Sequence, residues 1–452
     1  MNILNKIKNF IKTIRLSLNL EKLNNYVPVI ITRSEHNISR KNINKNVLRV
    51  LYKLKDHGYK SYLVGGGVRD LLLGRQPKDF DVATNAYPEK IKKLFKHCYI
   101  VGRRFQLAHV HFGSDVVEVA TFRASHSHRK HHSEEGMILR DNIYGNIEQD
   151  AVRRDFTINA LYYNIINYTL VDYVDGLKDL YAKQLCLIGD PTTRYREDPV
   201  RMLRAIRFAA KLEFSIAANT AQPIFSLKEL LLNIAPARLY DEYVKLFFYG
   251  HALESFKLLK QYGLLEILFP HWQSSLNKQV KQFNNNFIIQ GLKDIDGKII
   301  NHEQINPAWL IAILLWNEVR IVATEHKDKN KDKEKISEFI AYKYAAEKLL
   351  SEQNKIISLS KKLMIFIKDI WTLQVKLAKI AGKTDKRANK LSSSSKFGMA
   401  FEFLLLRATT GDKKAQRTAR WWHKYLAARK QIDDQDNNEN NNDENIVVLN
   451  EV

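Results

Sequence analysis

Hydrophobic and polar positions change their spacing near residue 195 of the chain. From about residue 45 to 170, short runs of β-branched and aromatic residues alternate with helical patterns. After about residue 195 the strand signals fade, and apolar residues recur at helical spacing to about residue 430. We therefore expect an α/β or α+β head, assigned to α+β, followed by an all-α remainder. The expected head elements are a helix from Val68 onward and strands at Tyr62–Val64, Phe80–Val82, His109–Phe112 and Val116–Phe122.

These patterns divide the chain into five predicted segments. We expect a basic N-terminal extension at 1–45, a head at 46–185, a helical neck at 186–270, a basic helical body at 271–430 and a tail at 431–452. The tail is acidic and rich in Asn, which predicts disorder. The stretch from Glu325 to Lys335 is dense in charge, which predicts a solvated loop inside the body.

The first 25 residues form a pattern of their own. Ile7, Ile11, Ile14 and Leu18 recur at helical spacing, with Lys and Arg between them, which predicts an amphipathic basic helix. Such a helix can lie on a membrane surface. Alternatively, it packs on the protein or frays as a chain terminus.

Composition excludes several classes of protein. With 45% hydrophobic and 10% aromatic residues, a mostly disordered chain is excluded. The longest wholly apolar run, Ala308 to Trp316, is shorter than the ~20 residues of a membrane span, and no signal peptide is expected. The two cysteines, Cys98 and Cys186, form no metal-binding pair. We expect a soluble protein of the reducing cytoplasm.

The formal net charge of +23 is distributed unevenly. Residues 1–60 carry +10, residues 61–250 only +4, residues 251–430 carry +16, and the last 22 residues carry −7. A positive excess of this size indicates a polyanionic partner, either nucleic acid or an anionic membrane. The alternative is biased codon usage, which would enrich Lys without any functional meaning.

A glycine-rich turn is the first candidate for chemistry. In LVGGGVRDLLLG (63–74) a predicted strand ends at Gly65, Gly66 and Gly67, and a helix begins at once. Backbone N–H groups exposed there and the start of the helix suit a phosphate group, and Arg69 can clamp a phosphate oxygen. Without other evidence, the glycines form only a turn.

Two aspartates follow closely in KDFDVAT (78–84). Asp79 and Asp81 are two residues apart, so in a strand they point to the same face. Paired carboxylates beside a phosphate-binding loop are what Mg²⁺ requires for phosphoryl or nucleotidyl transfer with two metal ions. The alternative, two carboxylates on a solvated strand edge, becomes weaker because the glycine turn precedes them.

A third group of charges lies in RRDFTINALYYN (153–164). Arg153 and Arg154 either neutralise a triphosphate or are ordinary surface charges. Asp155 is expected to cap a helix starting at Phe156, or to add negative charge at the metal site. Glu118, in a predicted strand, either faces the metals or is a partly exposed strand residue.

The fourth group opens a predicted helix in RYREDPVRMLRAIRFAAKL (194–212). Asp198 and Pro199 are typical of an N-cap and a first helical residue. Asp198, Arg201 and Arg204 follow at threefold spacing, close to one face. Asp198 can accept the amino group of adenine while Arg201 donates to a ring nitrogen. The structural alternative is a helix cap with an ion pair.

In this order and spacing, the four blocks resemble the class II nucleotidyltransferases of the polymerase-β superfamily, which comprise bacterial poly(A) polymerases and CCA-adding enzymes. The resemblance implies a polymerase-β-like head and Mg²⁺-dependent transfer of AMP from ATP to the 3′ ends of RNA. It assigns the metals to Asp79 and Asp81 and makes Asp155 the third acidic residue linked to activity. Nucleotide contacts fall to Gly65, Gly66, Arg69 and Arg154, and base recognition to Asp198, Arg201 and Arg204.

Within this family, the segment VGRRFQLAHVHFG (101–113) is similar to the poly(A) polymerase version. The resemblance then implies template-independent polyadenylation that promotes RNA processing and decay. The partners that it implies are single-stranded, sequence-tolerant RNA and RNA-decay proteins. A CCA-adding enzyme is the first alternative. A non-catalytic RNA-binding protein on a transferase scaffold is the second. The acidic tail departs from the basic tail that is usual in bacterial poly(A) polymerases.

Two clusters remain outside these blocks. His126, His128, His131 and His132 match no zinc spacing, so a loop near RNA is expected there. Trp421 and Trp422 lie among basic residues, a composition that suits stacking on single-stranded RNA. Packing of these tryptophans in the core is at least as well supported.

Overall fold

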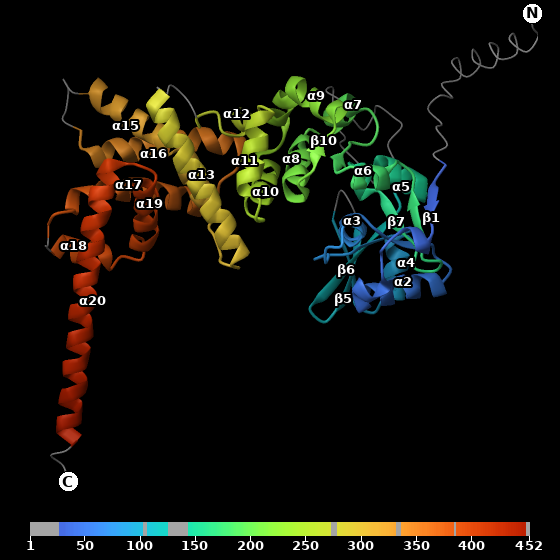
Figure 1. Cartoon of the computed structure of the whole chain (residues 1–452), viewed down its shortest axis with the longest axis horizontal. Helices are drawn as coiled ribbons and strands as arrows, with labels where there is room; N and C mark the ends of the chain where they lie inside the picture. The colour runs from blue at the N-terminus through green and yellow to red at the C-terminus, as the bar shows by residue number, and fades with distance from the viewer. Residues whose placement is uncertain are drawn as a thin grey trace, which may run out of the picture. The chain divides into compact units, whose positions relative to one another are not determined.

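The chain folds into two compact units, and we describe each by itself. The computed structural model describes residues 27–102, 106–124, 143–272, 278–330, 336–383 and 386–448 (Figure 1). Residues up to Arg201, with Glu213–Pro223, form the first unit, called the head below. Met202–Leu212 and the residues from Ile224 onward form the second unit. The expected boundaries at 185 and 270 remain predictions, and the division between the units lies inside a helix.

A mixed eight-stranded sheet forms the centre of the head. Its strand order is β1-β8-β7-β2-β3-β6-β5-β4. Neighbouring strands pair antiparallel except β3 and β6, which are parallel. The strands are β1 (Val29–Ile31), β2 (Ser61–Val64), β3 (Asp81–Thr84), β4 (Cys98–Val101), β5 (Leu107–Phe112), β6 (Asp115–Thr121), β7 (Leu161–Tyr163) and β8 (Leu170–Asp172). The α+β prediction and the strand positions in the head are confirmed.

Helices cover this sheet because their apolar residues lie on one side. In α2 (Lys45–Asp56) the buried residues are Val47, Val50, Leu51 and Leu54, a stripe at helical spacing. Helices α2 and α4 (Pro88–Leu94) pack together against the strands (Figure 1). Helix α3 (Gly66–Leu72) follows β2 directly and packs on β2 and β7. The predicted helix is therefore present, but it begins at Gly66, two residues before the expected Val68.

The segment after Arg154 differs from the prediction. The expected helix capped by Asp155 is absent, because a short 3₁₀ turn, Thr157–Asn159, begins after Phe156 and leads into β7. The apolar run Leu161–Tyr163 is fully buried between β2 and β8. Sheet burial of a β-rich run outweighs the weak helical preference of the residues before it.

The rest of the head consists of short elements that lead to the division between the units. They are α5 (Ile147–Arg153), α6 (Gly176–Tyr181), β9 (Gln184–Leu185), α7 (Pro191–Glu197) and β10 (Ser215–Ile216). Strands β9 and β10 pair in parallel. Helix α8 (Val200–Leu212) begins in the head, and from Met202 onward belongs to the second unit.

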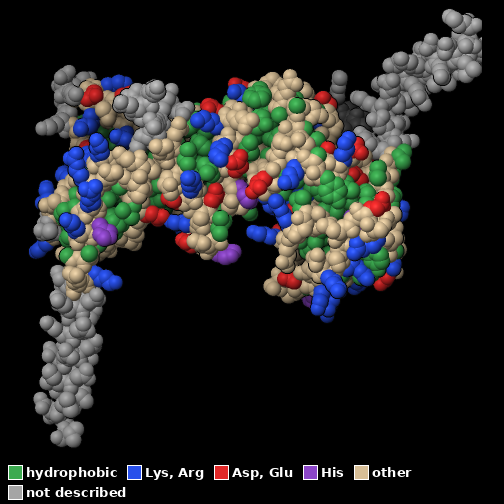
Figure 2. Space-filling view, viewed as in Figure 1, with side chains coloured by type: hydrophobic (Ala, Val, Ile, Leu, Met, Phe, Trp, Pro, Cys, Tyr) green, Lys and Arg blue, Asp and Glu red, His purple; other side chains and the backbone are tan. Residues whose placement is uncertain are grey.

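The described part of the second unit is helical. Its elements are α9 (Ala218–Leu227), which starts in the head, α10 (Pro236–Phe247), α11 (Ala252–Gln261), α12 (Leu265–Leu268), α13 (Lys278–Ile300), α14 (Ala308–Leu314), α15 (Trp316–Lys329), α16 (Glu338–Ile356), α17 (Lys361–Ile380), α18 (Lys386–Ser392), α19 (Phe397–Thr409) and α20 (Lys413–Val448). Trp272, Trp316, Trp371 and Trp422 are its largest buried side chains. Lys and Arg side chains gather over its C-terminal helices (Figure 2), in agreement with the positive charge of that part of the sequence.

Two predictions for this unit were wrong. Helix α15 runs through Lys329, so the first part of the predicted loop Glu325–Lys335 is helical. Helix α20 continues to Val448, through the tail predicted to be disordered. In both places a helix that has already been nucleated extends into a polar segment, and extension costs much less than nucleation.

Two other predictions concern residues outside the described ranges. They are the amphipathic helix within residues 1–25 and the histidine cluster between residues 126 and 132. Among the residues that the structure describes, no helix combines the length and the apolar run needed to cross a bilayer.

Candidate active site

The glycine turn and the two aspartates lie against each other in the head. Gly65 has φ +76°, and a Cβ atom placed on it would lie 3.2 Å from Asp81 Oδ2. A Cβ on Gly67 would lie 3.0 Å from Phe80 Cδ1 and 3.3 Å from the carbonyl oxygen of Asp79. Side chains at these positions would collide with the aspartate segment, so glycine is required by both conformation and space. The predicted coupling of the turn to Asp79 and Asp81 is therefore present in the fold.

Asp81 is the first residue of β3 and lies in parallel register with Glu118 on β6. Asp81 is open to solvent on one side, and the protein packed around its other side raises its pKa. Arg154 opposes this rise, whereas the charges of Glu118 and Asp79 add to it. Burial is the largest of these effects, and the three carboxylates of Asp79, Asp81 and Glu118 lie near Arg154, which also bonds to Asp150.

A divalent cation fits the charge of these carboxylates. Within the described residues, no group of three or more His, Cys, Asp or Glu side chains is arranged to hold a metal ion. A Mg²⁺ site of another kind uses one or two carboxylates and completes its coordination with substrate phosphates. The assignment of Asp79 and Asp81 to such a site remains a prediction. Glu118 is half exposed, lies in register with Asp81 on the neighbouring strand, and has its Oε1 3.7 Å from His109 Nε2.

Arg154 is held at this site by a buried network that the sequence did not reveal. Its Nη1 would lie 3.7 Å from a Cβ on Gly65. Its Nε donates to Asp150 Oδ2 at 3.1 Å and to the Tyr162 hydroxyl at 2.9 Å, and its Nη2 donates to Asp150 Oδ2 at 3.0 Å. Burial by itself would raise the pKa of Asp150, but Arg154 and Arg153 outweigh it and lower that pKa. Asp150 therefore stays ionised and orients Arg154.

Asp150 was missed because nothing in the local sequence distinguishes it from an ordinary helical carboxylate. The only available signal is spacing: Asp150 lies on α5, four residues before Arg154, which is the C-cap of that helix. Tyr162 was equally hidden, because it reaches the network from β7. The bonds of Tyr162 to Arg154 and to Asp150 form because the chain enters the sheet again as β7.

Arg69 lies on α3 and is almost completely buried. Its Nη2 forms an ion pair with Asp70 Oδ1 at 2.7 Å, and its Nη1 donates to Asn159 Oδ1 at 2.7 Å. These contacts tie α3 to the turn before β7. The assignment of Arg69 to nucleotide contact remains a prediction, while the bonds described give it a structural role beside Gly66.

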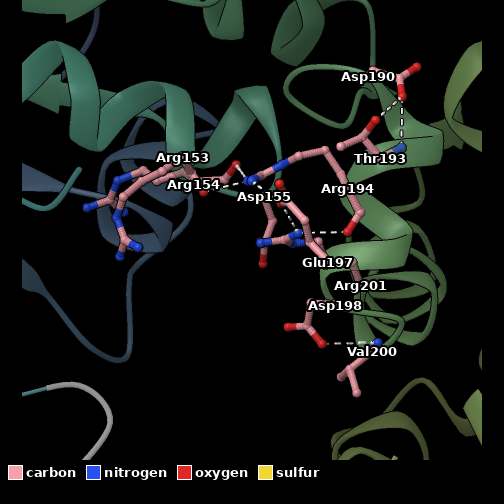
Figure 3. A network of polar contacts seen from close by, with 10 residues as sticks. All are labelled: Arg153, Arg154, Asp155, Asp190, Thr193, Arg194, Glu197, Asp198, Val200 and Arg201. Carbon is pink, nitrogen blue, oxygen red and sulfur yellow. Dashed lines mark hydrogen bonds and ion pairs between the residues drawn. The ribbon is translucent and has the colours of Figure 1, made fainter. Parts of the chain in front are cut away.

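Asp155 belongs to a second network, drawn in Figure 3. Its Oδ1 accepts from Arg201 Nε at 2.8 Å. Arg201 Nη1 donates to the carbonyl oxygen of Arg194 at 2.7 Å and to Glu197 Oε2 at 3.1 Å. Arg194 in turn donates through Nη1 to Glu197 at 2.8 Å and through Nη2 to the carbonyl of Arg154 at 2.9 Å. The network connects the Arg153–Asp155 segment to α7 and the start of α8.

The start of α8 was predicted to within a residue. Asp198 Oδ1 accepts from the backbone N–H of Val200 at 3.3 Å, and the Asp198 carbonyl accepts from Arg201 N at 3.0 Å. Arg204 follows one turn later on the same helix. In the second unit, Glu242 of α10 forms ion pairs with Arg207 at 3.8 Å and with Lys245 at 3.0 Å. Arg238 and Glu242 both lie on α10.

Comparisons with known proteins agree with this site. The family model "Poly A polymerase head domain" matches residues 61–186, which contain the glycine turn, the aspartates and Arg154. The model "Probable RNA and SrmB-binding site of polymerase A" matches residues 213–276, and "Polymerase A arginine-rich C-terminus" matches residues 334–446. "Poly(A) polymerase I" of Salmonella typhimurium is 45% identical over 406 residues, covering 88% of this chain and 86% of its own length.

The chain belongs to the poly(A) polymerase family. It is a polynucleotide adenylyltransferase. A "CCA-adding enzyme" of Lactobacillus helveticus is 36% identical over 217 residues, covering 48% of this chain and 53% of the relative, so that branch is more distant. A solved tRNA nucleotidyltransferase, complexed with a primer tRNA and an incoming ATP analogue, has a TM-score of 0.55 at 23% identity and covers 85% of this chain and 99% of its own. That similarity shows the fold, and the predicted fold class and family are confirmed.

Proposed function

We propose that this adenylyltransferase transfers AMP from ATP to the 3′ hydroxyl of single-stranded RNA, without a template, in a reaction that requires Mg²⁺. The observation that carries the proposal is the contact of the Gly65–Gly67 turn with Asp79 and Asp81, with Arg154 beside them. This arrangement, in a chain of the poly(A) polymerase family, places phosphate-binding groups next to metal-binding carboxylates.

In the proposed mechanism, Asp79 and Asp81 would hold two Mg²⁺ ions, which supply charge stabilisation at the triphosphate and activation of the attacking hydroxyl. The backbone of Gly65 and Gly66 approaches the phosphates closely because no side chain stands in the way. Arg154 donates to phosphate oxygens as negative charge moves toward the leaving pyrophosphate. Asp150 and Tyr162 hold Arg154 in place before the substrate arrives.

Adenine recognition is assigned to Asp198, Arg201 and Arg204 at the start of α8. Asp198 would accept a hydrogen bond from the exocyclic amino group of adenine, a donor that adenine shares with cytosine and that uracil lacks. Arg201 bonds through Nε and Nη1 within the chain, so we assign Nη2 to the base. Asp155 then acts through Arg201, which it orients through Nε, as a positioning residue.

Nucleotide selection tests the proposal. Purified protein is incubated with labelled oligo(A), Mg²⁺ and one nucleotide at a time, and in parallel with tRNA lacking its CCA end. We expect long tracts from ATP and much slower incorporation of CTP, UTP and GTP. Equal use of CTP, or growth that stops at CCA on tRNA, would assign the chain to the CCA-adding alternative.

The carboxylates are tested with Asp81→Asn, and with Glu89→Gln as a matched control on an exposed residue of the head. We expect Asp81→Asn to reduce extension on the order of 10³-fold or more, because several kcal/mol of charge stabilisation is lost. RNA binding should be retained by both variants. Full activity of Asp81→Asn would exclude the metal assignment, whereas wild-type protein that binds RNA without extending it would support the non-catalytic alternative.

The remaining assignments rest on the sequence. We propose the cytoplasm as the site of action and a contribution to RNA processing and decay, with RNA-decay proteins as partners. Contact of the N-terminal segment with a membrane surface is the weakest of these proposals. Fractionation of cells that express the full chain and a chain lacking residues 1–26 tests the compartment and the membrane contact together.

A further inference from the structure

Two hollows adjoin on the surface of the head, on the exposed side of α2. The larger has a volume of about 850 Å³ and the smaller about 560 Å³. Lys45 and Arg49 line both, so the two hollows are neighbours, and together they are called the basic groove below. The larger part runs between the 37–49 and 71–80 segments, and the smaller part continues along α2 to Asp56.

The basic groove carries a strong excess of positive charge. Its charged lining consists of the cations Lys41, Lys45, Arg49, Lys53, Arg75 and Lys78 and the carboxylates Asp56 and Asp115. Asp115 accepts a hydrogen bond from Asn46 Nδ2 at 2.9 Å. Lys and Arg side chains gather along the lower edge of the head, where α2 lies (Figures 1 and 2). Four of the six cations lie in residues 1–60, the segment that carries +10.

The cations on α2 are placed in a line. Lys45, Arg49 and Lys53 are four residues apart, and the buried stripe of the same helix faces the sheet. Successive members are therefore about 6 Å apart along the helix axis. Lys45 is the first residue of the helix, where the helix dipole disfavours a cation. Lys53 lies in the last turn, where the dipole favours a cation, so helix stability leaves only Lys45 unexplained.

One end of the basic groove adjoins the catalytic aspartates. Lys78 and Phe80 line the groove, and Asp79 stands between them in the chain. Phe80 also lies against the glycine turn, 3.0 Å from a Cβ placed on Gly67. Two lining residues therefore flank Asp79 in the chain, and Phe80 connects this end of the groove to the glycine turn.

The lining also contains groups that suit bases. Tyr52 in the smaller part and the partly buried Phe80 in the larger part offer aromatic surfaces at separate points. Asn37, Asn42, Asn44 and Asn46 line the larger part and both donate and accept hydrogen bonds. Cations that track a backbone, with aromatic rings for stacking, are the elements of sequence-tolerant binding to single-stranded nucleic acid.

We propose that the basic groove binds the phosphodiester backbone of the RNA segment immediately upstream of the 3′ hydroxyl. This proposal rests on the proposed function, since it supplies the second substrate of the same site. The groove is too long for a single phosphate, and its cations extend away from the nucleotide site along α2. A free polyphosphate shares the charge of RNA but would use only the end near Lys78.

The test compares two triple variants of the full chain. The groove variant is Lys45→Gln, Arg49→Gln, Lys53→Gln. The control is Lys90→Gln, Lys93→Gln, Lys96→Gln, which removes three exposed cations of the same unit that do not line the groove. For each protein we measure the Kd of labelled oligo(A) across a salt series, the KM for RNA, the KM for ATP and inhibition by pyrophosphate.

The groove variant should bind RNA at least about tenfold more weakly near 0.15 M salt. Its slope of log Kd against log salt should be smaller by roughly 2, because each lost phosphate contact on a single strand contributes about 0.7. The KM for ATP should be unchanged. Oligo(A) carrying a photoreactive base within about four nucleotides of the 3′ end should crosslink to the 41–53 peptide.

The remaining outcomes overturn the proposal. One is a groove variant whose slope of log Kd against log salt equals that of the control. Another is an equal loss of RNA affinity in both variants. The third is a changed KM for ATP or changed inhibition by pyrophosphate while RNA affinity stays the same. Wild-type protein that adds no AMP to RNA would contradict the proposed function instead. The binding and crosslinking measurements do not depend on that activity, so the two failures are distinguishable.

Discussion

Arg201 Nε donates a hydrogen bond to Asp155 Oδ1 at 2.8 Å, with 8% of the arginine side chain and 12% of the aspartate side chain exposed. Asp155 is counted among the acidic residues linked to activity, and Arg201 among those that read the base. The bond shows that they form a unit. Because Arg201 also holds the carbonyl of Arg194, this unit positions the start of α8.

The first prediction is that losses from changing Asp155 and Arg201 will not add. Asp155→Asn and Arg201→Gln should each reduce kcat/KM for ATP by about 10- to 100-fold, equivalent to a charge-assisted hydrogen bond of about 1.5–3 kcal/mol. The double variant should lose little more than the worse single variant. Steady-state kinetics of the three proteins give the coupling energy. Multiplied losses would instead indicate that Asp155 acts at the metals independently.

The second prediction concerns Glu118, which lies in register with Asp81. The negative charge of Glu118 contributes to the raised pKa of Asp81, so Glu118→Gln should lower that pKa. Activity requires the Asp81 carboxylate, and therefore the acidic limb of the pH–activity profile should move to lower pH. Near neutral pH, activity should change less than about tenfold, since a half-exposed charge is screened by solvent.

The profile should be measured at subsaturating Mg²⁺, where protons compete with the metal for Asp81. Asp115→Asn removes another head carboxylate, on the same strand, and should leave the acidic limb in place. A loss in Glu118→Gln as large as that of Asp81→Asn would make Glu118 a direct metal ligand.

The third prediction separates two costs of a side chain at Gly65. Gly65 and Gly58 both have positive φ, at +76° and +80°, so alanine at either position should cost about 1–3 kcal/mol of backbone strain. A Cβ on Gly58 meets nothing within 4 Å, whereas one on Gly65 lies 3.2 Å from Asp81 Oδ2. Thermal unfolding should thus be affected similarly, while only Gly65→Ala loses most of its activity. Equal activity in the two variants would contradict a close approach of substrate to this turn.

The fourth prediction distinguishes Trp422 from Trp421. Trp422 is fully buried, and its Nε1 donates to the carbonyl of Leu377 at 3.1 Å. Trp422→Ala should therefore lower the free energy of unfolding by about 3–5 kcal/mol. Trp421 is partly exposed and stacks on Tyr425, with ring centroids 5.2 Å apart.

Trp421→Ala should destabilise the fold by less than Trp422→Ala. If the Trp421 ring also stacks on a base, this variant should bind oligo(A) about 5- to 100-fold more weakly, from about 1–3 kcal/mol of stacking. Chemical denaturation and RNA binding, measured on both variants, test the two roles. Unchanged RNA affinity in Trp421→Ala would show that both tryptophans serve only in packing of the fold.

The sequence by itself determined the parts of this protein that depend on local rules. The spacing of apolar residues predicts the strands of the head and the helices after it, because burial of one face imposes the period. Glycines followed by paired aspartates predict a phosphate and metal site, because few backbones other than glycine permit such a close approach. Asp198 and Pro199 predict the start of α8, because a cap acts on the residues next to it.

Only the tertiary structure decided how these parts serve one another. Asp150 and Tyr162 reach Arg154 because β7 enters the sheet beside β2, a pairing that no short segment specifies. Asp155 was expected to cap a helix, but its partner is Arg201, 46 residues away. The basic groove likewise joins the 37–53 segment to residues 71–80. Such contacts join residues that are far apart in the sequence. Their stabilising energy comes from buried charge pairs and packed surfaces, which the spacing of residues within one short segment does not reveal.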